Sequence, residues 1–72
     1  MYSPHIATMA ESELEMAERH VSEQKDRILK QHAVIGRLGA HRIPTALAEL
    51  VLASMEELLV NMQAHVTRLK AQ

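Results

Sequence analysis

The segment from residue 36 to residue 45 most constrains how this chain can fold. It contains both glycines of the sequence, Gly36 and Gly39, and one of the two prolines, Pro44. A long segment with helical periodicity lies on each side of it, and glycine and proline are the residues that most often end helices. The sequence therefore predicts an all-α fold in which two helices form an antiparallel coiled-coil hairpin.

The first predicted helix spans about residues 4–38. Pro4 after a serine favours a start at Pro4, and Thr8 with Glu11 has the spacing of an alternative capping box. We expect Gly39 to cap the end of the helix in the left-handed conformation, with Gly36 as the alternative stop. A heptad frame fits the segment, with Ala7, Leu14, Val21, Ile28 and Ile35 at its a positions and Ala10, Ala17, Gln24, Gln31 and Leu38 at d.

The second predicted helix spans about residues 45–70, after a turn at about 39–44, so residues 1–72 form a single hairpin. Its a positions are Leu52, Leu59 and Val66, and its d positions are Ala48, Met55, Met62 and Leu69. If Ile28 faces Met55, every a position of one helix meets a d position of the other, as an antiparallel coiled coil requires. The predicted hairpin seam consists of Leu14, Val21, Ile28, Ile35, Leu52, Met55, Leu59, Met62, Val66 and Leu69.

The two flanks of this seam differ in character. On one flank the same register predicts the charged or polar pairs Glu11–Lys70, Glu18–Gln63, Lys25–Glu56 and His32–Glu49. On the other flank it pairs His20 with His65, Arg27 with Leu58 and Val34 with Val51, and Leu47 lies beside them. We expect the charged flank to face water and the apolar flank to face another subunit.

A small chain with an apolar flank needs further burial to be stable. The 72 residues contain no cysteine, and their only aromatic residue is Tyr2, so oligomerisation is the remaining way to enlarge the core. We predict a homodimer in which two hairpins form a four-helix bundle. The predicted dimer interface consists of Val34, Leu47, Val51, Leu58, His20 and His65, and the alternative is a monomer with an exposed apolar flank.

The sequence contains no catalytic motif. It has no Ser/His/Asp arrangement, no phosphate-binding glycine loop and no paired-carboxylate cleft, so we expect a non-enzymatic protein without a cofactor. Of five histidines, only His20 and His65 are expected to be adjacent, and they form a weak candidate metal pair without a third ligand. Gln24 and Gln31 are expected to lie at the edge of the seam, or to bond each other across a dimer, and to fix register.

Charge is distributed unevenly along the chain. Residues 11–26 carry six acidic residues, whereas residues 27–48 carry no acidic residue but contain Arg27, Lys30, Arg37 and Arg42. The basic turn region could bind a nucleic acid or another acidic partner, could dock beside the acidic segment of a second hairpin, or could simply be solvated. The net charge of −1 argues against nucleic-acid binding by bulk electrostatics. We therefore expect an unidentified protein partner in addition to the homodimer.

The N-terminus lacks a positive region followed by an apolar run, and no apolar stretch approaches the ~18 residues needed to span a bilayer. From this pattern we predict no contact with membranes and a cytoplasmic location.

A family resemblance extends over roughly residues 18–70. The runs His20-Val-Ser-Glu23, Ile28-x-x-Gln31 and Val34-Ile35-x-x-Leu38 resemble the first helix of a family of short bacterial helical-hairpin proteins. The second helix of that family is similar to the run from Thr45 to Leu52, followed by Glu56, Leu59, His65 and Arg68-Leu69. Family members often have Gly-His-Asp-Thr before the second helix, and this chain lacks the aspartate. The resemblance implies a helical hairpin and no known activity.

Overall fold

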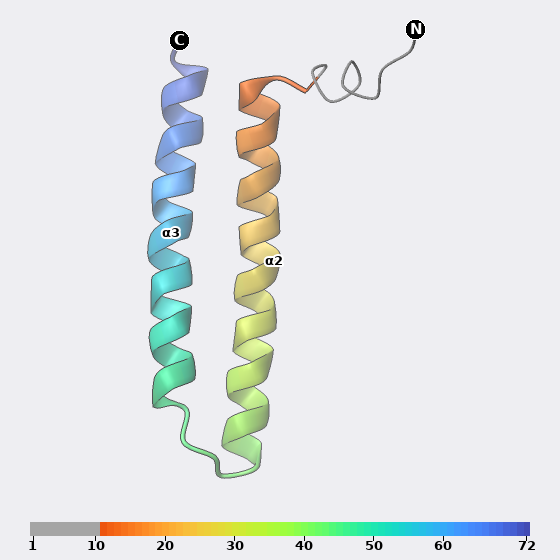
Figure 1. Cartoon of the computed structure of the whole chain (residues 1–72), viewed down its shortest axis with the longest axis vertical. Helices are drawn as coiled ribbons and strands as arrows, with labels where there is room; N and C mark the ends of the chain where they lie inside the picture. Colours follow the sequence, from red (N-terminus) through yellow and green to blue (C-terminus); the bar gives the residue numbers. More distant parts are fainter. Residues whose placement is uncertain (1–10) are drawn as a thin grey trace, which may run out of the picture.

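The computed structural model describes residues 11–72, and this part of the chain forms two α-helices joined by a short loop. Helix α2 covers Glu13–Ala40 and helix α3 covers Ala46–Lys70. The helices lie side by side and run in opposite directions, with the C-terminus next to the start of α2 (Figure 1). The predicted all-α hairpin is confirmed for the described residues. We call the two ends of the hairpin the loop end, at residues 41–45, and the open end.

Helix α2 begins with a capping box. The Glu15 backbone N–H donates to Ser12 Oγ at 3.0 Å, and the Ser12 backbone N–H donates to Glu15 Oε1 at 2.9 Å. These two bonds satisfy donors that have no partner within the helix. Because Ser12 has an extended backbone with ψ of 164°, the prediction of a helix running through residues 11 and 12 is wrong. The predicted starts at Pro4 and Thr8 lie outside the described residues.

Helix α2 ends in a Schellman motif whose left-handed residue is not a glycine. The Ile43 N–H donates to the Leu38 carbonyl at 2.8 Å, and the Arg42 N–H donates to the Gly39 carbonyl at 3.1 Å. Between these bonds, Arg42 takes the left-handed conformation, with φ of 57°. The prediction that Gly39 is the left-handed cap is therefore wrong. The helix continues through Ala40, a strong helix former, so the left-handed position falls on Arg42.

Helix α3 begins after Pro44, with Thr45 at the N-cap position. The Thr45 side chain makes no capping bond to the backbone. Instead, its hydroxyl donates to the carboxylate of Glu49, and the Glu49 N–H donates to the Thr45 carbonyl at 2.9 Å. An acidic side chain in the first turn also interacts favourably with the helix dipole. This start therefore depends on the pairing of Thr45 with Glu49.

The hairpin is a single layer of two helices, and it encloses little core. Ala17 is the one buried apolar residue in the described part of the chain, and Gln24 is the one buried polar residue. The side chains of the ten residues assigned to the seam are all half-buried: Leu14, Val21, Ile28, Ile35, Leu52, Met55, Leu59, Met62, Val66 and Leu69. Two helices cover each seam residue from one side only, so the hairpin leaves apolar surface exposed to solvent.

Two glutamines on α2 bind the backbone of α3. Gln24 Nε2 donates to the Met55 carbonyl oxygen at 2.9 Å, and Gln31 Nε2 donates to the Ala48 carbonyl oxygen at 2.8 Å. Seven residues separate the two glutamines, and seven separate the two acceptors, so the same contact recurs one heptad apart. The expectation of a seam-edge position is wrong for Gln24, which is buried, and agrees with the half-buried Gln31. A bond between glutamines across a dimer stays a prediction.

Candidate interaction surface

The residues predicted to form a dimer interface share one flank of the hairpin, which we call the apolar flank. It comprises Val34, Leu47, Val51, Leu58, His20 and His65. Leu47 is 74% exposed, Val51 44% and Leu58 49%, while Val34 is half-buried and both histidines are exposed. Leu47, Val51 and Leu58 follow one another at spacings of four and seven residues, which places them along one stripe of α3. An apolar stripe of this kind is typical of a surface that binds another protein.

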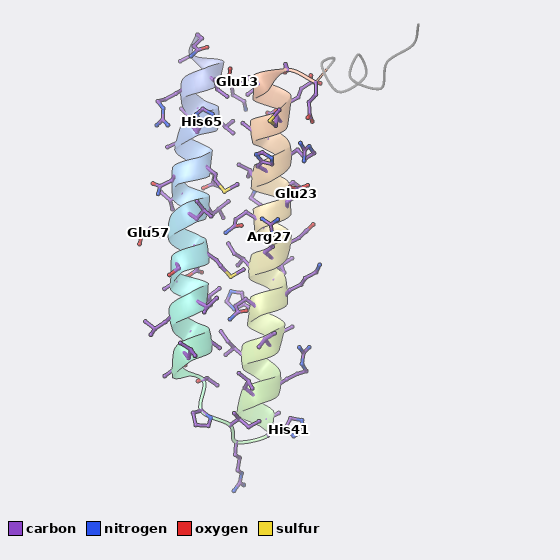
Figure 2. All side chains as sticks on the ribbon, in the orientation of Figure 1. Glu13, Glu23, Arg27, His41, Glu57 and His65 are labelled. Atoms are coloured by element: carbon purple, nitrogen blue, oxygen red, sulfur yellow. The ribbon has the colours of Figure 1, made fainter. Side chains whose placement is uncertain are left out.

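Near the open end, His20 and His65 line a shallow groove between the helices together with Ala17, Asn61 and Met62. Figure 2 shows His65 on α3 in this half of the hairpin. Within residues 11–72, no cluster of three or more His, Cys, Asp or Glu side chains is arranged to hold a metal ion. The structure therefore brings the two histidines to one groove, where a hairpin alone supplies two imidazole ligands and no third.

The other flank, which we call the charged flank, also carries a groove. Its lining includes Glu18, Lys25, Gln63 and Lys70, and Lys70 Nζ lies 3.6 Å from Glu18 Oε2. Glu18 and Gln63, which were predicted to face each other, line this groove together, but the predicted pairing of Lys70 with Glu11 is wrong. The physical reason is that α2 begins at Glu13, which leaves Glu11 off the helix and away from the predicted register.

Arg19 binds two carboxylates at the open end. Its guanidinium bonds Glu11 at 3.1 and 3.2 Å and Glu23 at 3.2 Å. The hydrogen bonds from Arg19, and then its positive charge, lower the pKa of Glu11, and the same contacts raise the pKa of Arg19. The sequence reasoning did not assign a role to Arg19, although the spacing of four residues to Glu23 is a known signal for a helical ion pair.

The charge asymmetry of the sequence becomes an asymmetry between the two ends of the hairpin. The salt bridges among residues 11–72 all involve residues of the open half: Glu11, Glu18, Arg19, Glu23 and Lys70. Figure 2 shows Glu13 and Glu23 toward the open end of α2 and His41 at the loop. Arg27 donates to Gln24 Oε1 at 3.3 Å. In the described part of the chain, Lys30, Arg37 and Arg42 form no salt bridge, and the acidic residue at the loop end is Glu49 in the first turn of α3.

Comparison with known proteins gives no relative: no family model matches the chain, and no match is found among curated proteins or solved structures. The resemblance to a family of short bacterial hairpin proteins therefore stays a prediction. Within the described residues, neither helix is both long enough and apolar enough to cross a membrane.

Proposed function

We propose that this chain is a non-enzymatic interaction module that acts as a homodimer, in which two hairpins pack through their apolar flanks into a four-helix bundle. The observation that supports this most directly is the exposure of Leu47, Val51 and Leu58 in one stripe of α3. The seam residues are only half-buried within one hairpin. A second hairpin packed on this side would bury both the edge of the seam and the stripe.

The position of the candidate metal pair fits the same proposal. His20 and His65 belong to the apolar flank, where amphipathic side chains commonly border an interface. The groove they line is shallow, and the groove on the charged flank contains solvated carboxylate and ammonium groups. The Glu18 carboxylate lines that groove together with Ser22 and is paired with Lys70 at 3.6 Å, and our proposal assigns binding, and no reaction, to the hairpin.

Sedimentation equilibrium at micromolar concentration tests the proposal. A particle of twice the chain mass of 8.1 kDa is expected, with a dissociation constant low enough for the monomer fraction to be minor. A homogeneous monomer over that concentration range would refute it. Affinity capture with the dimeric chain would then identify the protein partner, using a variant that fails to dimerise as the control.

A second candidate function is the binding of a nucleic acid or another acidic partner at the loop end. It is favoured by Lys30, Arg37 and Arg42, which form no salt bridge among the described residues, together with the nearby Arg27. Such binding should weaken steeply as salt concentration rises, because it depends on cation–phosphate or cation–carboxylate contacts. Fluorescence anisotropy with a mixed-sequence RNA and with a polyglutamate peptide tests this candidate, and no salt-dependent binding of either would reject it.

A further inference from the structure

We infer that the second hairpin docks head to tail, so that the loop end of each copy lies beside the open end of the other. This inference rests on the proposed homodimer and specifies its geometry. The two-fold axis then runs perpendicular to the helices and passes near Ser54, the exposed residue between Val51 and Leu58 on α3.

Charge decides between the two possible orientations. In a parallel dimer, the loop ends of the two copies would lie side by side. The cations of the acid-free segment of each chain would then face one another: Arg27, Lys30, Arg37 and Arg42. Like charges at close range are unfavourable, and the four cations of each chain outnumber the acidic residues of that half, which are Glu49 and Glu56 on α3. In a head-to-tail dimer, the same cations face the acidic half of the partner's α2.

The apolar stripe is self-complementary under the head-to-tail arrangement. A two-fold axis near Ser54 places Leu58 of one copy against Val51 of the partner subunit, and the reciprocal contact follows by symmetry. Ser54 has a small side chain, which allows the two α3 helices to approach closely at the axis. Val51 and Leu58 therefore each pack on an apolar side chain of the other copy, and Leu47 lies beside Asn61 of the partner subunit.

The same axis also pairs charges on α2. It brings Arg37 to within about one helical turn, roughly 5 Å along the helix, of Glu23 of the partner subunit. Arg37 forms no salt bridge among the described residues, whereas Glu23 is bound on one side by Arg19 at 3.2 Å. A carboxylate can accept from two guanidinium groups, so Glu23 can bind Arg19 of its own chain and Arg37 of the partner. The head-to-tail geometry thus buries the apolar stripe and also gives Arg37 a carboxylate partner.

Single cysteines provide the test, because the sequence contains none. Ser54→Cys places the thiol near the proposed axis, and Asn61→Cys places it seven residues farther along the same helix face. In the head-to-tail dimer the two Asn61 positions are separated by about 20 Å along the helices. A disulfide requires Cα atoms within roughly 7 Å. Both variants replace exposed polar residues on α3 and are matched in every other respect.

Each variant is first sedimented in its reduced form, and is then oxidised at low concentration and run on a non-reducing gel. We expect both to be dimeric when reduced, and only Ser54→Cys to form a covalent dimer. A mixture of Leu47→Cys and Asn61→Cys should also form a covalent heterodimer, because these positions face each other across the axis.

Efficient cross-linking of Asn61→Cys to itself would overturn the inference in favour of a parallel dimer. A reduced dimer that cross-links at neither position would show that another face forms the interface. Either result would leave the proposed homodimer intact, whereas monomeric reduced variants would refute the homodimer itself.

Discussion

Gln24 on α2 donates a hydrogen bond from Nε2 to the main-chain carbonyl oxygen of Met55 on α3, at 2.9 Å. Its side chain is buried, with 2% of its surface exposed, and its Oε1 accepts from Arg27 at 3.3 Å. The amide group thus uses both its donor and its acceptor inside the hairpin. A polar residue in a coiled-coil seam fixes register more than it adds stability, because it is satisfied in only one alignment of the helices.

We predict that Gln24→Glu destabilises the hairpin at neutral pH, although the side chains have the same shape. A carboxylate cannot donate to the Met55 carbonyl, and it would be a buried charge beside a carbonyl oxygen. The expected loss is about 2–3 kcal/mol in the free energy of unfolding, measured by urea denaturation.

Gln63→Glu is the matched control, because Gln63 is exposed and lies near Lys25 and Lys70. Its free energy of unfolding should change by less than about 0.5 kcal/mol. In the Gln24→Glu variant, burial and the Met55 carbonyl oxygen raise the pKa of the new carboxyl against the opposing hydrogen bond from the exposed Arg27. We expect burial to dominate, so that the protonated form is favoured in the folded state. The stability deficit should therefore shrink as the pH falls toward about 4, where a protonated carboxyl can donate again. Equal effects of the two substitutions would contradict the role assigned to Gln24.

Opposite substitutions at the end of α2 should both increase stability. Arg42→Gly removes the cost of a left-handed conformation at a residue with a Cβ, and the expected gain is about 0.5–1 kcal/mol. Gly39→Ala should gain a similar ~0.5–1 kcal/mol, because Gly39 is helical and an added Cβ would meet no atom within 4 Å. Thermal denaturation followed by circular dichroism measures both. A lower melting temperature for Gly39→Ala would instead support Gly39 as the left-handed cap.

The Ser12–Glu15 capping box should contribute measurably to the stability of α2. Ser12→Ala removes the oxygen that accepts from the Glu15 N–H, and we expect a loss of about 1 kcal/mol in urea denaturation. Ser22→Ala is the control, because Ser22 is an exposed residue in the interior of α2, where alanine is the better helix former. The assignment of Ser12 as the cap fails if Ser12→Ala is as stable as Ser22→Ala.

The hairpin itself could be predicted because its signals are regular. The heptad positions from Leu14 to Ile35 and from Ala48 to Leu69 recur over several turns, and the glycine- and proline-containing segment separates them. Helix ends depend on single residues and were predicted less well. Both Thr8-x-x-Glu11 and Ser12-x-x-Glu15 have the spacing of a capping box, and sequence alone does not rank them. The left-handed position fell on Arg42, which carries no sequence signal for that conformation.

Side-chain partners could not be predicted from a register alone. The register that sets Ile28 opposite Met55 pairs Cα positions. The Gln24 side chain instead reaches the Met55 carbonyl, one turn from the residue that Gln24 faces, and Lys70 reaches Glu18. Long side chains choose among several partners within a turn, and the choice depends on local geometry. The apolar flank was easier to predict, because short apolar side chains such as Val51 remain where the helix places them. The character of each surface was therefore predictable, and its hydrogen bonds were not.

The Glu11 carboxyl should titrate below its ordinary range. Arg19 donates two hydrogen bonds to it, which favour the ionised form and lower its pKa. Because the folded-state pKa is the lower one, any stability from this contact is present above the unfolded-state pKa of about 4.3 and is lost as the pH falls through the folded-state value. Side-chain carboxyl NMR measures the midpoint. Arg19→Gln should raise it to the ordinary range, and an unchanged midpoint would show that Arg19 does not hold Glu11 in solution.

Leu58→Glu should disrupt the homodimer while leaving the hairpin folded. Leu58 belongs to the apolar flank and is 49% exposed, so a carboxylate there is solvated in the monomer but would be buried against an apolar partner in the dimer. Losing one well-packed interface residue of this kind costs ~2 kcal/mol or more. Both copies in the symmetric dimer carry the substitution, so association weakens by roughly 1,000-fold. Sedimentation equilibrium gives the dissociation constant, and circular dichroism shows whether helix content is kept.

Val60→Glu is the matched control for Leu58→Glu. Val60 is an apolar residue of the same helix, only two positions away and 62% exposed. Two residues turn an α-helix by about 200°, so Val60 lies on nearly the opposite side of α3. If the apolar flank is the interface, Val60→Glu dimerises as the unmodified chain does. If the outer face of α3 is the interface, Val60→Glu weakens dimerisation more than Leu58→Glu does. If Leu58→Glu still dimerises and Val60→Glu does not, the interface lies on the outer face of α3. That result would also contradict the docking geometry inferred from the apolar stripe.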